Sequence, residues 1–249
     1  MIRLLALFML LALPAKAEEI VLGLSRDEVA ITVTFQGSEI VVFGAVNRTA
    51  PPPQDSNLGV VVTIAGPREP VTVRRKARRM GIWVNTDAVF VNSAPSFYAV
   101  ATSAPIAEIL REIEDLRYRI TIPRAIRSAG AVVEDSVAFT EALIRIKTDQ
   151  DLYQMLEGAV TLDQDTLFRS AISMPANLIE GNYDVRIYLT RNGAVIDDYT
   201  TTIPVNKVGL ERWLYNLAHE QAFIYGLLSL AIAVGAGWLA SAVFSLLRR

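Results

Sequence analysis

Residues 222–247 read AFIYGLLSLAIAVGAGWLASAVFSLL and contain no charged side chain. As a helix, these 26 residues would measure about 39 Å, which is more than the ~30 Å hydrocarbon core of a bilayer. Twelve of them are Leu, Ile, Val or Phe, and each such side chain favours membrane insertion by roughly 0.3–0.6 kcal/mol. The sequence therefore predicts a transmembrane helix over 222–247, followed by the short tail 248–249.

The first 17 residues have the pattern of a secretory signal peptide. Arg3 precedes the apolar run 4–13, and Ala15-Lys16-Ala17 fits the small-x-small cleavage pattern. Cleavage after Ala17 is one reading, and an uncleaved anchor is the alternative, although the run is short for a span. With the helix at 222–247, cleavage predicts an inner-membrane protein with a periplasmic bulk and a cytoplasmic tail at 248–249.

Charge and cysteine content limit the classes of function. Residues 18–221 hold all 26 acidic residues but only 20 of the 24 Lys and Arg. This acidic balance gives no general attraction for nucleic acid. The chain has no cysteine, so it has neither a disulfide framework nor a thiol nucleophile.

Residues 18–104 have the period-two pattern of β-strands separated by Gly and Pro turns. A hairpin is expected from 28–35 and 39–46, because a Gly turn separates two β-branched runs. The other expected strands are 58–65, 71–79, 81–85, 88–92 and 97–103. Short strands at this spacing are typical of an immunoglobulin-like β-sandwich, and we expect a mainly β fold with such a domain over 18–104.

Residues 105–207 predict a smaller α+β membrane-proximal domain. An amphipathic helix is expected from Pro105 to Arg117, because apolar residues recur at helical spacing: Ile106, Ile109, Leu110, Ile113 and Leu116. A second helical stretch is expected over 135–156, with an interruption near 148–151. Strands are expected at 159–163, 167–174, 183–190 and 194–205, and Asn192-Gly193 favours a tight type I′ hairpin turn. A juxtamembrane helix over 208–221 then leads to the span.

No residue set in the chain identifies a reaction, so we expect a non-enzymatic protein without a cofactor. The single histidine, His219, lies three residues before the span and lacks the partners of a metal site or proton relay. The pairs Asp149/Asp151 and Asp163/Asp165 could bind a hard cation, but they lack the glycine and distal glutamate of a calcium loop. Helix capping and turn solvation are the favoured interpretation of these pairs, and we expect no metal site.

One basic cluster stands out in this acidic region: Arg74, Arg75, Lys76, Arg78 and Arg79. On a strand, Arg74, Lys76 and Arg78 would share one face, and Arg75 and Arg79 the other. The cluster could protect an edge strand from self-pairing through its charge. Alternatively, it could bind an anion or a partner, because guanidinium groups suit oxyanions, carboxylates and anionic headgroups.

The predicted transmembrane helix has a possible packing face. Small residues recur every four positions at Ala233, Gly237, Ser241 and Ser245, which would let a second helix approach closely. The same residues are also common in spans without any partner. The expected partners are thus the bilayer and another inner-membrane protein, or a second copy of the chain.

Three stretches resemble a family of transmembrane proteins of alphaproteobacteria: TFQGSEIVVFGAV (34–46), RRKARRMGIWVNTDAVFVNSAPSFYAVATS (74–103) and LIEGNYDVRIYLTRNGAV (178–195). The family has no established activity, so the resemblance implies topology and not catalytic residues. Its members are often encoded near sulfite exporters of the TauE/SafE type, which implies an accessory role beside an anion permease. The alternative is a periplasmic module that binds or senses a small anion.

Overall fold

The computed structural model describes residues 18–25, 28–31, 37–48, 57–127, 136–207 and 217–247. The chain divides into a β-rich unit, which ends at Val205, and a second unit that contains the C-terminal helix α7 (Ala222–Leu247). The bounds of α7 confirm the helix expected at 222–247. The expected signal peptide, the segment 208–216 and the tail 248–249 lie outside the described residues.

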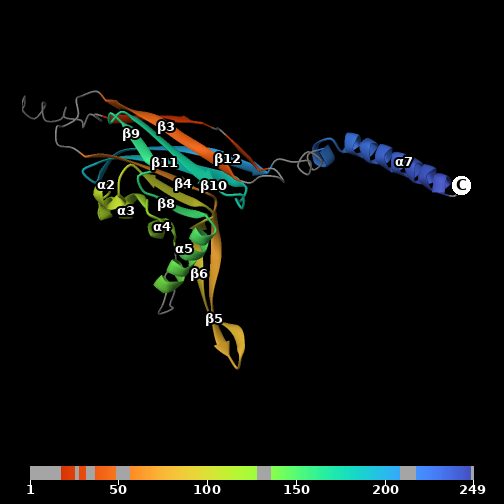
Figure 1. The fold of residues 1–249 in the computed structure, drawn as a ribbon, viewed down its shortest axis with the longest axis horizontal. Helices are drawn as coiled ribbons and strands as arrows, with labels where there is room; N and C mark the ends of the chain where they lie inside the picture. The colour runs from red at the N-terminus through yellow and green to blue at the C-terminus, as the bar shows by residue number, and fades with distance from the viewer. Residues whose placement is uncertain are drawn as a thin grey trace, which may run out of the picture. The chain divides into compact units, whose positions relative to one another are not determined.

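A four-stranded sheet forms one layer of the β-rich unit (Figure 1). Its order is β1 (Glu18–Leu24), β3 (Ser38–Arg48), β10 (Leu167–Met174) and β9 (Val160–Asp163), and all neighbours are antiparallel. Along β10, buried and exposed residues alternate strictly. One face of this sheet is therefore exposed to solvent, and the other contributes to the core.

A six-stranded sheet forms the second layer. Its order is β2 (Val29–Ile31), β12 (Ala194–Lys207), β11 (Gly181–Arg191), β4 (Leu58–Ala65), β7 (Tyr98–Thr102) and β8 (Tyr153–Leu156). Every residue of β4 and of β7 is buried. Successive side chains of a strand point to opposite faces, so both faces of this sheet are covered at its centre.

Short helices cover one of these faces. A Cβ atom at Gly59 would lie 2.7 Å from Cβ of Ile109, so the residues of β4 that share this face point toward α2 (Ile106–Ile109), α3 (Glu112–Tyr118) and α4 (Ile122–Ala125). On the same face, the hydroxyl of Tyr98 donates a 2.8 Å hydrogen bond to the carbonyl oxygen of Ile120. The alternate residues Val60, Val62 and Ile64 are fully buried toward the four-stranded sheet.

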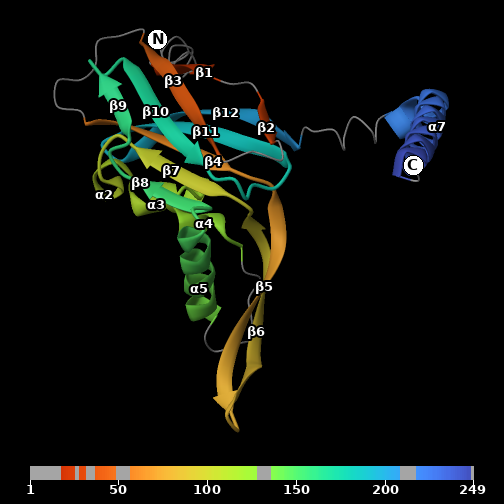
Figure 2. The ribbon, with the colours of Figure 1, turned by 45° about the vertical axis from the view of Figure 1, so that its right-hand side comes forward.

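A long hairpin leaves the sheet between two neighbouring strands. Strands β4 and β7 pair directly, and the chain between them forms β5 (Arg68–Arg79) and β6 (Ile82–Pro95), which make a separate two-stranded sheet. Figures 1 and 2 show this hairpin, here called the arm, projecting away from the two larger sheets. Helix α5 (Ser136–Asp149) lies beside the base of the arm, where Val73, Val89 and Val91 are buried.

The mainly β class is confirmed, but the strands are shared differently from our expectation. We expected an immunoglobulin-like sandwich within 18–104 and a separate domain over 105–207. Instead, β3 pairs with β10 and β4 pairs with β11, so both large sheets combine strands from either side of residue 104. The expected hairpin of 28–35 with 39–46 is not formed by its described residues, because β2 and β3 belong to different sheets, and residues 32–35 lie outside the described part of the chain. The two strands expected at 81–85 and 88–92 are one strand, β6, which begins at Ile82 and is preceded by a turn at Gly81.

The expected helix over 105–117 is broken at Leu110, which has an extended backbone. Arg111 N–H donates a 2.8 Å hydrogen bond to the carbonyl oxygen of Gly193 instead of continuing the helix. The next helix starts with a different orientation, and Ile113 and Leu116 are exposed rather than buried. The turn formed by Asn192 and Gly193 has positive φ at both residues, as expected for type I′.

The second helical stretch, expected over 135–156, ends at Asp149 as α5. Asp151 has a φ of +57°, which ends the helical path. Residues 153–156 then form β8, which pairs parallel with β7. The expectation that helix would extend to residue 156 is therefore wrong, because residues 153–156 form a strand.

A buried carboxylate joins the two large sheets. Glu18 on β1 accepts hydrogen bonds from Arg48 Nε on β3 (2.9 Å) and from Arg191 Nη2 on β11 (2.5 Å). The Glu18 side chain is only 5% exposed. Such a pairing offsets the cost of burying the three charges, and loss of one partner leaves the others uncompensated.

We predict that Glu18→Gln lowers the free energy of unfolding by about 3 kcal/mol, because two buried arginines lose their counter-charge. Glu112→Gln is the matched control: Glu112 pairs with Arg124 at 3.4 Å, but its side chain is 83% exposed. The control should lose less than ~0.5 kcal/mol. Guanidinium denaturation of the full chain in detergent, followed by circular dichroism, measures both, and equal losses would contradict the role of the Glu18 contact.

Candidate functional site

The arm ends in a two-residue turn formed by Met80 and Gly81. Arg79 and Ile82 are the last paired residues, and φ is +49° at Met80 and +84° at Gly81. Positive φ at both central residues gives a type I′ turn, whose twist matches that of the flanking strands. The glycine meets this demand without strain, but the methionine adopts a backbone conformation unusual for its type.

The structure places all five residues of the basic cluster on β5, in the outer part of the arm. Each of the five is exposed: Arg74, Arg75, Lys76, Arg78 and Arg79. From Val71 to Arg79 every residue of β5 is paired with a residue of β6, and the irregularity between Arg75 and Lys76 is taken up on β6, where Thr86 is skipped in the pairing register. The cations are therefore divided between the two faces of a ribbon, as the sequence predicted. Arg75 and Arg79 line a hollow on their face, which they share with the carboxylate of Asp87.

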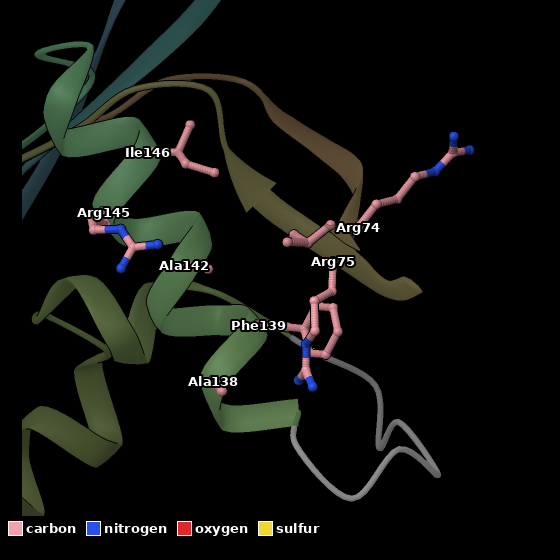
Figure 3. A pocket seen from close by; sticks show the side chains of 8 residues that line it. Arg74, Arg75, Ala138, Phe139, Ala142, Arg145 and Ile146 are labelled. Atoms are coloured by element: carbon pink, nitrogen blue, oxygen red, sulfur yellow. The ribbon is translucent and has the colours of Figure 1, made fainter. Parts of the chain in front are cut away.

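One of the five packs against α5. The guanidinium carbon of Arg75 lies 4.8 Å from the ring centroid of Phe139, and Figure 3 shows the two side chains stacked while Arg74 points away from the helix. Around this contact, side chains from α5 and β5 line a hollow of about 320 Å³, including Val73, Ala142 and Ile146. Arg75 therefore helps to hold the arm against α5.

The apolar residues at the tip were not recognised as a surface from the sequence. Met80 is fully exposed, and Ile82 and Trp83 are 64% and 68% exposed. From the sequence, 81–85 is expected to be an ordinary strand, with no indication that its apolar side chains are exposed. The sequence feature that could have indicated this surface is the basic run 74–79, followed directly by Met80-Gly81 and Ile82-Trp83.

A second group of cations lies on the helix-covered side of the six-stranded sheet. Burial lowers the pKa of Arg68, and repulsion by Arg127, Arg186 and Arg119 lowers it further. Arg68 also donates a 2.9 Å hydrogen bond to the carbonyl oxygen of Ala125. Arg68 and Arg186 are distant in sequence from each other and from Arg119 and Arg127, and only the tertiary fold brings these residues close enough for the other three to repel Arg68.

The described residues contain no group of three or more His, Asp or Glu side chains placed to hold a metal ion. His219 is exposed in the short helical segment 217–220. Asp151 and Asp165 lie in turns with positive φ, in accordance with their interpretation as turn residues.

The four small residues expected to form a packing face, Ala233, Gly237, Ser241 and Ser245, all lie on α7. A Cβ atom at Gly237 would meet nothing within 4 Å, and the same holds at Gly235. A larger side chain at either position therefore creates no clash within the described chain.

The sequence matches a known family of proteins. A family model described as "Putative transmembrane protein (Alph_Pro_TM)" matches residues 19–246, which is nearly the whole chain. No curated protein matches the sequence.

We predict that Arg75→Gln lowers the free energy of unfolding by about 1 kcal/mol, because the guanidinium–ring contact is lost. Arg74→Gln is the control with the same change of charge and should leave stability unchanged within ~0.5 kcal/mol. Urea denaturation of the two variants distinguishes the outcomes. Equal stability of the two variants would show that the contact with Phe139 does not hold the arm.

Proposed function

The chain belongs to this family of transmembrane proteins, and on that premise we propose that it is a non-enzymatic, single-span inner-membrane protein that assists a membrane partner. Its β-rich unit lies in the periplasm, and its C-terminus lies in the cytoplasm. The partner is an integral membrane protein such as an anion exporter of the TauE/SafE type.

The observation that carries this proposal is the character of α7. It is the one helix among the described residues that is long and apolar enough to cross a membrane, and it contains no charged residue. A single uncharged helix encloses no polar path across a bilayer, and transport sites need polar side chains that face a protein interior. If the chain takes part in anion export, a separate permease therefore forms the transport path and the chain assists it.

The face of α7 with Ala233, Gly237, Ser241 and Ser245 is the proposed contact with that partner. Without a hydrophobic driving force between helices in lipid, association depends on close van der Waals packing, and small residues permit it. Because Gly237 has open space around its Cα within the chain, a partner helix can approach there.

We predict that Gly237→Ile reduces co-purification of the membrane partner, or self-association if the partner is a second copy. The isoleucine side chain would separate the helix backbones. Gly235→Ile is the matched control, because it adds the same side chain to an equally open position about 200° around the helix. Affinity capture in mild detergent, with quantitative mass spectrometry of the captured proteins, compares the two.

Equal capture by both variants would contradict the packing face. Absence of any stoichiometric membrane protein in the wild-type capture, together with a monomeric state in detergent, would contradict the accessory role itself. Membrane insertion of each variant is checked by alkaline extraction, so that failed insertion is not mistaken for lost contact.

Binding of a small anion is the second candidate function, and the group around Arg68 favours it. Burial is the main cause of the lowered pKa of Arg68, and repulsion by Arg127, Arg186 and Arg119 adds to it. An anion held among these arginines would relieve the repulsion. This candidate moves the anion site from the basic cluster on β5, whose cations alternate between faces, to the covered side of the six-stranded sheet.

We predict for this second candidate that sulfite or sulfate raises the unfolding temperature of the full chain above that in chloride of equal ionic strength. Saturation at 100 times the Kd corresponds to about 2.7 kcal/mol of stabilisation. Arg127→Gln should abolish the shift, whereas Arg169→Gln, on the exposed face of β10, should retain it. An identical response to chloride would rule the site out.

A further inference from the structure

The tip of the arm presents apolar side chains that nothing else in the described chain covers. Met80 is fully exposed, and Ile82 and Trp83 are each about two-thirds exposed. A Cβ atom at Gly81 would meet no atom within 4 Å. Exposure of tryptophan, isoleucine and methionine to water is unfavourable, so their transfer to a less polar environment would lower the free energy.

Cations flank these apolar residues at matching positions along the arm. Arg79 pairs with Ile82, and Arg78 pairs with Trp83. Directly paired residues of an antiparallel ladder point to the same face, so each face of the tip carries one guanidinium beside one large apolar side chain. The two faces of the tip thus have the same amphipathic character.

Most of the basic cluster has no compensating charge. Arg74, Lys76, Arg78 and Arg79 form no ion pair with any carboxylate that the structure describes. The rest of residues 18–221 is acidic, with all 26 carboxylates of the chain. A concentration of cations at the end of a projecting ribbon therefore creates a local positive potential that attracts an extended anionic surface.

We propose that the tip of the arm docks on the surface of an anionic phospholipid bilayer. Met80, Ile82 and Trp83 enter the region between headgroups and acyl chains, where tryptophan is preferred. The long stems of Arg78 and Arg79 lie along this apolar layer while their guanidinium groups reach the phosphates. Lys76 and Arg74, further from the tip, add attraction to the anionic surface.

Two features favour a bilayer over other anionic ligands. A small anion needs donors that converge, whereas these cations are divided between the two faces of the ribbon. The two that line a common hollow, Arg75 and Arg79, share it with the carboxylate of Asp87, which would repel an anion. The chain also carries a membrane span, so lipid is always available to it at high effective concentration. The proposal does not depend on which protein packs against α7, and it holds even if the accessory role is wrong.

The test uses the full chain, which has no cysteine. Ile82→Cys therefore gives a single site for the environment-sensitive fluorophore NBD. The labelled protein is reconstituted, one copy per disc, into nanodiscs of phosphatidylcholine alone or with phosphatidylglycerol. We expect a blue shift, a rise in intensity and quenching by nitroxide lipids in the phosphatidylglycerol discs.

The control label is Thr161→Cys, on an exposed position of β9, which lies at the other end of the β-rich unit from the tip in Figure 2. It should show no dependence on lipid charge. Arg78→Glu with Arg79→Glu should abolish the blue shift at Ile82→Cys. Salt should also reduce it, because the Debye length falls from about 10 Å at 0.1 M to about 3 Å at 1 M.

Addition of phosphatidylglycerol vesicles to the phosphatidylcholine discs separates two sources of lipid. A shift only on addition of vesicles supports docking on a second bilayer, and a shift within the discs supports docking on the bilayer that holds the chain. A water-like NBD spectrum in both experiments overturns the proposal. The proposal would also be overturned if anionic lipid had no effect but free phosphate or a protein, added to the labelled chain in detergent, produced the blue shift. That result would assign the tip to the added ligand.

Discussion

The fold depends on the burial of β4 and β7 on both faces. An apolar strand without a solvent-facing side requires a cover above and below it. Here the four-stranded sheet supplies one cover, and the helices between β7 and β8 supply the other. This requirement explains why segments before and after residue 104 are combined in both large sheets: each provides part of the cover for strands of the other.

The same constraint produces the arm. Because β4 and β7 pair directly, the segment between them has no place in the six-stranded sheet, and it pairs with itself. A two-stranded ribbon has little stability alone, so its base is packed against α5 through Val73, Val89 and Phe139. Beyond that contact the ribbon buries nothing. Its outer part is free to carry side chains that a packed sheet would not tolerate.

Arginine has three different roles in the structure. Arg48 and Arg191 are mostly buried and both pair with Glu18, which links the two sheets. Arg75 lies on an aromatic ring and fastens the arm. The cations further along β5 form no ion pair with the described carboxylates and lie at the exposed end of the ribbon, beside Ile82 and Trp83. This exposed arrangement is the basis of the proposed docking on an anionic bilayer.

The sequence alone determined the features that depend on short-range patterns. The uncharged run gave α7 with its bounds, the period-two pattern gave most strands, and Asn192-Gly193 gave a tight turn. Tertiary structure decided which strands pair, because β3 with β10 and β4 with β11 join residues more than a hundred positions apart, and local periodicity carries no information about such partners. It also decided that Leu110 interrupts a helix, since Arg111 bonds to the distant Gly193. The basic cluster was visible in the sequence. Its exposure, and that of the apolar residues at the tip of the arm, follow only from the pairing of β4 with β7, which leaves the segment between them outside the six-stranded sheet.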